Sequence, residues 1–208
     1  MKNHLFVLVG PSAVGKNAVL GRIRARHPSV AEVISATTRP PRPGETNGVH
    51  YRFIDKRAFL SMAESGQLAE WVEFEGYLYG TPIDMLNPTA TSVAIVDTVG
   101  AVNIKKAMGL RASTIFIMPP SDACLRERFT RRSAYDGEDV ERRMERARAD
   151  MAMADQFDHK VVNDDLDAAA GVVAGIMGLR RPILSDSRVR RQVCSEKEKK
   201  NGQQEKIA

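Results

Sequence analysis

The chain has 208 residues, 43% of them hydrophobic, and its 31 Lys and Arg against 26 Asp and Glu give a formal charge of +5. From Arg180 onward there are nine basic and four acidic residues, which leaves 22 of each sign before it. The excess charge therefore belongs to the end of the chain, and the neutral body excludes a protein that binds nucleic acid through a broad basic surface. The chain has only two cysteines, Cys124 and Cys194, which predicts a cytoplasmic protein without a disulfide framework. Its first apolar run covers only residues 5–9, too short for a signal peptide or a membrane span.

Short apolar runs alternate with helical patterns along most of the chain. Strands are predicted at 4–9, 30–35, 92–97, 113–118 and 160–163, and helices after the first Gly-rich turn to about 26 and at 101–108, 121–130, 138–154 and 166–179. This order is typical of a parallel sheet with crossover helices. Residues 37–81 break it with a Pro-rich turn, a short helix near 56–65 and aromatic runs such as 68–74. They predict a small, mostly β lobe inserted into an α/β core.

These patterns predict one domain over residues 1–184. Its core consists of 1–35 and 88–184, and the inserted lobe is 36–87. Residues 185–208 have low hydrophobicity and many charges, which predicts a disordered tail.

Residues 10–16, GPSAVGK, have the Walker A spacing, directly after the first strand and at the start of the first helix. In such a turn, backbone N–H groups converge on one point and form an anion site, and Lys16 adds a positive charge between the β- and γ-phosphates. The alternative is a glycine-containing turn with a solvated lysine. The predicted ATP-binding residues of this segment are Gly10, Pro11, Ser12, Ala13, Val14, Gly15, Lys16 and Asn17.

The residues after Lys16 depart from the usual P-loop. Asn17 and Ala18 stand where a Ser or Thr hydroxyl normally helps to hold Mg²⁺, and Ala13 stands where glycine is common. The amide oxygen of Asn17 can ligate Mg²⁺ or one of its waters, whereas Ala18 offers no ligand. We therefore expect Mg²⁺ to arrive with ATP and to have at most an indirect contact at Asn17.

A second phosphate site is predicted from residues 35–45, SATTRPPRPGE, and from 48–51, GVHY. Arg39 and Arg42 lie three apart in a loop that prolines stiffen, and two guanidinium forks can clamp a phosphate. The phenol of Tyr51 adds a neutral donor. The alternative is an exposed, Pro-rich basic loop.

These two segments resemble the signature of guanylate kinases, and the likeness continues at Glu70-Trp71, at 79–82 (YGTP) and at Asp97 with Gly100, over about residues 4–179. The resemblance implies a P-loop nucleoside monophosphate kinase that phosphorylates GMP with ATP, and a lobe that binds GMP. It implies that Arg39, Arg42, Tyr51 and Tyr79 hold the GMP phosphate and that Ser35, Glu70, Thr81 and Asp97 bind the guanine. Guanine offers N–H donors that carboxylates accept and an O6 that a hydroxyl can serve.

The same resemblance implies a helical lid at about 128–143, with Lys16, Arg128, Arg132 and Arg143 in phosphoryl transfer. Positive charge is needed there because the transferred group spreads negative charge over its oxygens. Five further arginines crowd this stretch, so a solvated helix face with i,i+4 ion pairs remains an alternative. Residues 161–166, VVNDDL, match the family's strand end beside the adenine of ATP, where Asn163 would pair; Asp164 or Asp165 can also cap the next helix.

Some positions depart from the family's pattern. Val99 replaces a common Gln, Ile95 replaces an acid, and the segment between Thr81 and Asp97 is about one helical turn short. Two alternatives to a GMP kinase therefore stay open: a non-catalytic guanylate kinase-like module that binds nucleotide or protein, and a sugar-phosphate kinase similar to ribose 1,5-bisphosphate phosphokinase. The expected partners are ATP and GMP, without nucleic acid or membrane, and the expected state is a monomer or homodimer.

Overall fold

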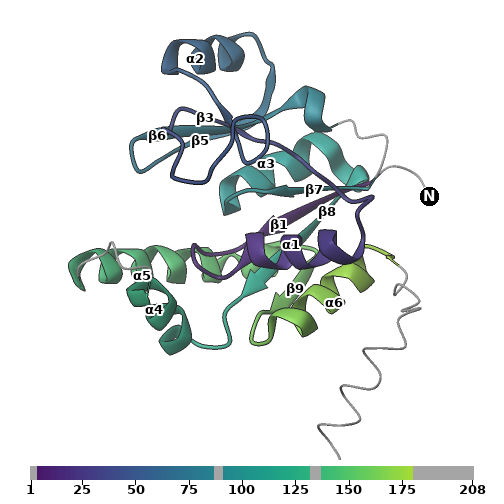
Figure 1. Ribbon diagram of the computed structural model, residues 1–208, viewed down its shortest axis with the longest axis vertical. Coiled ribbons are helices and arrows are strands. Elements are labelled where there is room, and N and C mark those ends of the chain that lie inside the picture. The colour runs from purple at the N-terminus through teal and green to yellow at the C-terminus, as the bar shows by residue number, and fades with distance from the viewer. Residues whose placement is uncertain (1–3, 87–90, 132–136, 180–208) are drawn as a thin grey trace, which may run out of the picture.

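The protein has a five-stranded parallel core sheet and a smaller four-stranded sheet beside it (Figure 1). The computed structural model describes residues 4–86, 91–131 and 137–179. The core strands, in spatial order, are β2 (Ala31–Glu32), β7 (Ser92–Ile95), β1 (Leu5–Val9), β8 (Ala112–Met118) and β9 (His159–Val162). The helices around them are α1 (Lys16–Arg26), α3 (Thr98–Met108), α4 (Asp122–Arg131), α5 (Gly137–Ala152) and α6 (Leu166–Ile176), with short 3-10 turns at Gly109–Arg111 and Ala154–Gln156.

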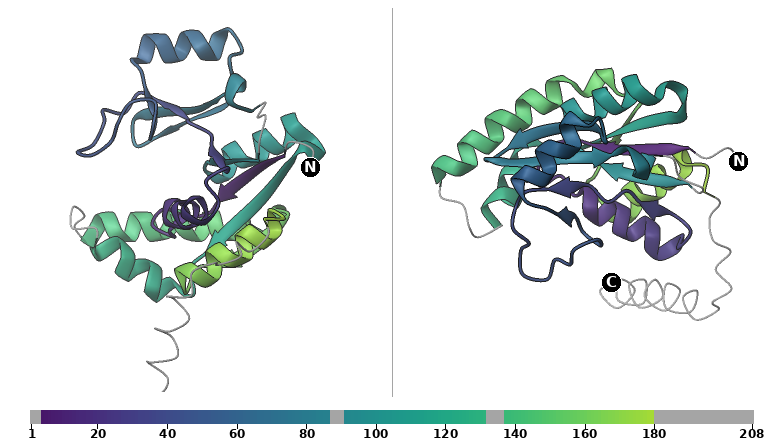
Figure 2. Two further views of the ribbon diagram at one scale, coloured as in Figure 1. Left: turned by 45° about the vertical axis from the view of Figure 1, so that its right-hand side comes forward. Right: turned by 90° about the horizontal axis from the view of Figure 1, so that it is seen from above.

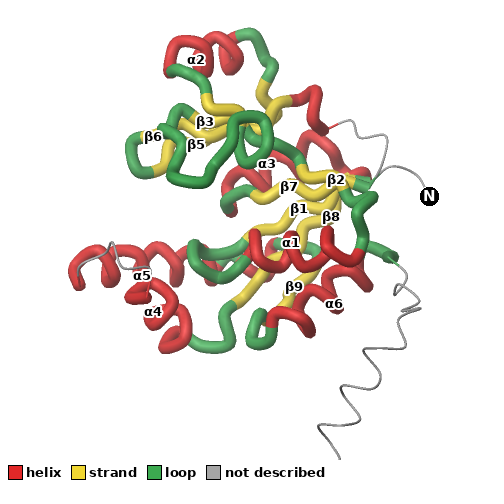
Figure 3. The backbone as a smooth tube through the Cα atoms, viewed as in Figure 1, coloured by secondary structure: helices red, strands yellow, loops and turns green. Residues whose placement is uncertain are grey.

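The core sheet is buried on both faces. Successive side chains of a strand point to opposite faces, so β1 sends Phe6 and Leu8 toward α1 and α6, and Leu5, Val7 and Val9 toward α3. A central parallel strand covered on both sides reads as an unbroken apolar run, which is why β1 contains no polar residue. Figure 3 shows the helices on the two sides of the sheet.

The inserted lobe has a small core of its own. Its sheet has the order β4 (Arg52–Phe53), β3 (Ala36–Thr37), β6 (Tyr77–Pro82) and β5 (Leu68–Phe74), and α2 (Lys56–Glu64) covers it. Only Ala36, Phe59 and Leu78 are buried in this core, with Ile54 and Leu68 packed against them. A 3-10 turn, Ile83–Leu86, follows β6.

Helices α4 and α5 pack on each other through a separate apolar cluster that includes Leu125, Phe129 and Met144. The helix pair and the lobe both lie toward the carboxyl ends of the core strands, the lobe above and the helices below in Figure 1. The left view of Figure 2, turned by 45°, again shows the lobe above and the helix pair below the core sheet. Ligands of open α/β sheets bind at this edge.

The predicted α/β class, with a parallel core and an inserted small β lobe, is confirmed. The element limits differ in places: the second strand spans only Ala31–Glu32, α3 begins at Thr98, and α6 ends at Ile176. Asp97 accepts a hydrogen bond from the Gly100 N–H at 2.7 Å, and this cap starts α3 earlier than apolar periodicity indicates. Part of the predicted lid and the predicted tail lie outside the described residues. Across 4–86, 91–131 and 137–179, no helix has both the length and the apolar character needed to cross a membrane.

Candidate active site

A cavity of about 450 Å³ lies between the P-loop, the lobe and α5, which is a volume typical of small-molecule sites. Predicted residues from all three regions line it. They are Gly10, Ser12, Ala13, Gly15, Lys16 and Asn17 from the P-loop, Ser35, Arg39, Arg42, Tyr51, Glu70, Tyr79 and Asp97 from the acceptor side, and Arg143 from α5. The two phosphate sites predicted separately from the sequence therefore face one space.

The P-loop turns sharply between β1 and α1, and glycine is required at two points of the turn. Gly10 has a φ of 133°, and a Cβ there would lie 2.3 Å from the carbonyl oxygen of Ile117. Gly15 has a φ of 101°, and a Cβ there would lie 2.4 Å from Nδ2 of Asn163. The ammonium group of Lys16 donates to the carbonyl oxygens of Gly10, at 2.6 Å, and Pro11, at 3.0 Å. Backbone atoms thus hold the lysine beside the turn.

Ala13 also has a positive φ, 62°, which is uncommon for a residue with a Cβ. Its methyl group packs against the apolar cluster of α4 and α5. This contact offsets part of the conformational cost and explains how alanine is accommodated where glycine would be strain-free.

Arg39 is held by its neighbours although it is a predicted phosphate ligand. Its Nη2 donates to both carboxylate oxygens of Glu45, at 2.8 and 2.9 Å, and its Nη1 donates to the Pro40 carbonyl at 2.7 Å. The guanidinium lies 5.5 Å from the centre of the Tyr51 ring, within cation–π range. Burial alone would raise the pKa of Glu45, but hydrogen bonds from the Arg42 N–H and from Arg39 lower it, so this carboxylate stays ionised.

The predicted guanine side contains two acidic groups close together. Glu70 is 7% exposed and accepts a hydrogen bond from the Thr81 hydroxyl. Burial raises the pKa of Glu70 to about 7; the Thr81 hydrogen bond opposes this shift, and the charge of Asp97 adds to it. A Cβ on Gly100 would lie 2.8 Å from Oε2 of Glu70 and 3.1 Å from Oδ1 of Asp97, so a side chain at this position would press against the pair.

Other predicted residues lie away from the cavity wall. Arg128 donates to the carbonyl oxygens of Val14, at 3.1 Å, and Asn163, at 2.9 Å. The buried side-chain amide of Asn163 donates to the Val14 carbonyl at 2.8 Å. Both side chains tie the P-loop to the end of β9. Arg132, also predicted, lies outside the described residues.

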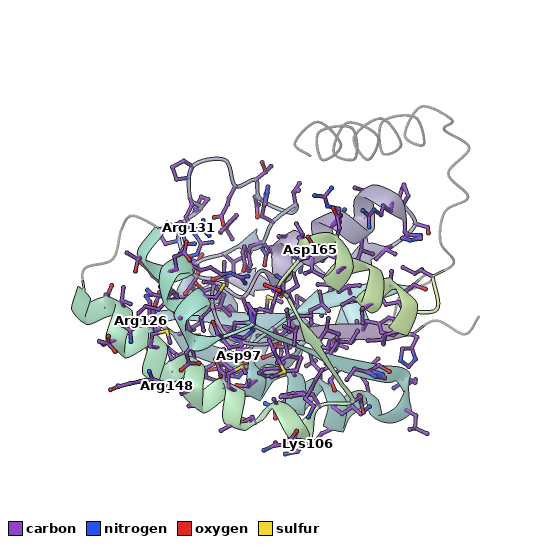
Figure 4. The ribbon with its side chains drawn as sticks, turned by 90° about the horizontal axis from the view of Figure 1, so that it is seen from below. Asp97, Lys106, Arg126, Arg131, Arg148 and Asp165 are labelled. Carbon is purple, nitrogen blue, oxygen red and sulfur yellow. The ribbon has the colours of Figure 1, made fainter. Side chains whose placement is uncertain are left out.

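The remaining arginines of α4 and α5 divide into two groups. Arg126, Arg131 and Arg148 each pair with an acidic residue of these helices: Glu141, Glu127 and Asp122, respectively. They do not line the cavity, and Figure 4 shows them on the helix pair. Arg142, Arg143 and Arg146 do line it. Arg142 also pairs with Asp139 of α5, so ion pairing and cavity lining overlap on this helix. Of the lid arginines predicted for phosphoryl transfer, Arg143 is the one of those described that lines the cavity.

Comparison with known proteins decides the family. A family model described as guanylate kinase matches residues 2–178. The guanylate kinase of Gloeobacter violaceus is 42% identical over 179 residues, which cover 84% of this chain and 87% of that protein. The guanylate kinase of Frankia casuarinae is 40% identical over 177 residues, which cover 83% of this chain and 96% of that protein. The chain belongs to the guanylate kinase family. The crystal structure of the Anaplasma phagocytophilum guanylate kinase superimposes with a TM-score of 0.69 at 26% identity, covering 88% of each chain. The family expected from the motifs is thus confirmed.

Within this family framework, the cavity offers oxygen ligands suitable for Mg²⁺. Among the residues that the structure describes, no group of three or more His, Cys, Asp or Glu side chains could hold a metal ion by itself. Asn17, Asp97 and Asp150 nevertheless line the cavity. Mg²⁺ commonly keeps several waters and binds through substrate phosphates with one or two protein oxygens. The donor set therefore fits an ion that is carried mainly by ATP.

Three acidic residues of the cavity had no role in the sequence analysis. Glu45 ends the segment 35–45 from which the second phosphate site was predicted. An acidic residue six positions after Arg39 was the feature of the sequence that could have indicated their ion pair. Asp150 accepts from the Thr98 hydroxyl at 3.0 Å; burial raises its pKa, while that hydrogen bond and the charge of Lys16 oppose the shift. Glu75 pairs with Arg143. No local pattern marks the last two, because their partners are far away in the sequence.

Proposed function

We propose that the protein transfers the γ-phosphoryl group of ATP to GMP, with Mg²⁺, and that the reaction takes place in the cytoplasm. The observation that carries the proposal is the single cavity lined by Lys16, by Arg39 with Arg42, and by Glu70 with Asp97. One cationic group suits the donor phosphates, the second suits the acceptor phosphate, and the carboxylates suit a base with N–H donors.

The proposed division of labour follows from the chemistry of each group. Backbone N–H groups of the P-loop and Lys16 bind the β- and γ-phosphates. Mg²⁺ would arrive with ATP, with at most an indirect contact at Asn17, and would supply positive charge that neutralises the phosphate oxygens. Arg39, Arg42, Tyr51 and Tyr79 hold the acceptor phosphate in line with the donor. Because little covalent chemistry is required of the protein, positioning and charge neutralisation supply most of the rate.

Guanine selection is proposed to rest on Glu70, Asp97, Ser35 and Thr81. The ionised carboxylate of Glu70 accepts N–H groups of guanine, whereas adenine presents the opposite pattern at the corresponding edge. Since the pKa of Glu70 is about 7 without ligand, binding guanine favours loss of its proton. A sugar phosphate brings no base N–H groups for Glu70 and Asp97 to accept, which favours the nucleotide over the sugar-phosphate alternative.

A coupled assay with ATP, Mg²⁺ and GMP tests the proposal. We expect GDP formation with GMP and at least ~100-fold lower kcat/KM with AMP, CMP and UMP. These three bases lack the paired N–H donors of guanine that the carboxylates accept. No turnover with any of the four acceptors would overturn the kinase reaction. Calorimetry would then test the non-catalytic alternative, which requires GMP binding without Mg²⁺-dependent ATP binding.

A further inference from the structure

Helix α5 contacts the tip of the β5–β6 hairpin through two arginines. Nη2 of Arg143 lies 2.6 Å from Oε1 of Glu75, and the guanidinium of Arg146 lies 4.5 Å from the centre of the Phe74 ring. Arg143 and Arg146 are three residues apart and therefore share one face of the helix. The side chains of Arg143 and Glu75 are only 12% and 30% exposed, so water screens this ion pair less than a surface pair.

The backbone conformation at Glu75 is unfavourable for a glutamate, which indicates that its carboxylate has a role beyond forming the turn. Phe74 pairs with Tyr77, so Glu75 and Gly76 form a two-residue turn, and their φ values are 52° and 78°. Turns with two positive φ values favour Asn-Gly, Asp-Gly or Gly-Gly, and a glutamate pays a conformational cost there. The local conformation thus disfavours the residue whose side chain reaches Arg143.

Ring contacts connect the same hairpin to the acceptor clamp. The ring of Phe74 lies 6.2 Å from that of Tyr79, which lies 6.1 Å from that of Tyr51, and the Tyr51 ring lies beneath the Arg39 guanidinium. The contacts between α5 and the hairpin are therefore continuous with the predicted GMP phosphate ligands.

We propose that Glu75 is a positioning residue for phosphoryl transfer, which holds the guanidinium of Arg143 at the cavity wall. Both residues line the cavity together with Lys16 and Arg39. A carboxylate on one edge of a guanidinium fixes its orientation, and a cationic donor fixed in advance needs no reorganisation during the reaction. The inference rests on the proposed GMP kinase reaction and on the role of Arg143 in it.

The decisive variant is Glu75→Asn, which gives the turn a favoured Asn-Gly sequence but removes the charge. We expect kcat to fall about 5–10-fold, within the range of coupling between contacting residues, while the KM for ATP stays within twofold. The thermal midpoint should change little, because the better fit of Asn to a positive φ offsets the loss of the partly buried ion pair. A merely structural role would lower kcat and the thermal midpoint together.

Two comparisons complete the test. Glu73→Gln removes the same charge from an exposed site on β5 and should retain kcat within twofold. In an Arg143→Ala background, Glu75→Asn should cause no further loss, since it acts through that arginine. The inference is overturned if Glu75→Asn keeps wild-type kcat, or if its loss persists undiminished without Arg143. Failure of the wild-type and Glu73→Gln proteins to phosphorylate GMP would instead overturn the proposed function.

Discussion

The two halves of the cavity are built in different ways. On the P-loop side, Lys16, Arg128 and Asn163 all bind backbone carbonyl oxygens, and the turn rests on the main sheet. On the lobe side, cation and carboxylate groups are held mainly by other side chains, as in Arg39 with Glu45 and Glu70 with Thr81, on a sheet with a small core. The P-loop half, the proposed donor site, thus rests on backbone groups, whereas the proposed acceptor site depends on side-chain pairs and on a lobe with a small core.

The largest effect on ligand binding is expected from adding one methyl group to the P-loop, the half of the cavity that backbone groups build. In Gly10→Ala the new Cβ would lie 2.3 Å from the Ile117 carbonyl oxygen, at a φ of 133°. We expect ATP affinity to fall at least ~100-fold by calorimetry, because the N–H groups of the turn would lose their convergence. Gly21→Ala is the matched control: no atom lies within 4 Å of its Cβ, so the helix should gain up to about 1 kcal/mol. Equal behaviour of the two variants would refute this picture of the P-loop.

The next effect tests the small core of the lobe. Phe59 is fully buried there, and Phe59→Ala should cost about 3–5 kcal/mol. Because the lobe has few other buried residues, we expect it to open locally, with lost hydrogen-exchange protection in β3–β6 and lost GMP binding but retained ATP binding. Phe129→Ala removes an equally buried ring from the α4–α5 cluster and should leave the protection of the lobe intact. Uniform loss of protection throughout the chain would contradict a separately opening lobe.

A smaller effect concerns the charge of Glu70. Its pKa of about 7 lies above its ordinary value of 4.5, so its contribution to stability is present below pH 4.5 and is lost as the pH rises through 7. Glu70→Gln, which resembles the protonated acid, should therefore be more stable than the wild type by about 1–3 kcal/mol at pH 8 in urea unfolding.

GMP binding should depend on the pH in the opposite sense, because guanine requires the carboxylate. The ratio of wild-type to Glu70→Gln affinity should fall by up to about tenfold per pH unit below 7, and using the ratio cancels the titration of the GMP phosphate. A ratio that is constant between pH 5 and 8 would remove Glu70 from guanine binding.

The smallest effect is expected at the P-loop position that departs from the usual motif. Asn17 is exposed to the cavity and follows Lys16 directly. In Asn17→Ser a hydroxyl replaces a bulkier amide, and we expect kcat/KM at limiting Mg²⁺ to rise about threefold, since a small hydroxyl accommodates the octahedral ion more easily. Ala18→Ser adds a hydroxyl one position later as the comparison. A decrease for Asn17→Ser would show that the amide is the better ligand.

Sequence patterns predicted the donor side more completely than the acceptor side. Residues 10–16 need only a strand, a tight turn and a helix start, and all three are encoded locally by the apolar run, the glycines and the spacing. On the acceptor side the Pro-rich loop indicated a phosphate clamp, but Tyr79 and the guanine residues could be named only through the family signature. The loop itself does not indicate that Arg39 meets Glu45 and Tyr51. The predicted roles of Arg128 and Asn163 remain predictions, and in the structure both side chains brace the P-loop.

The sequence by itself determined the α/β class, the inserted lobe, the glycine-rich turn between β1 and α1, and the family, since each depends on periodicity or on residues close together in the chain. Only the tertiary structure decided which cations share one cavity, that the pKa of Glu70 is raised to about 7, and that Glu75 meets Arg143 across 68 positions of sequence. Burial and ion pairing depend on how the lobe and the helices pack, and no local pattern carries that information.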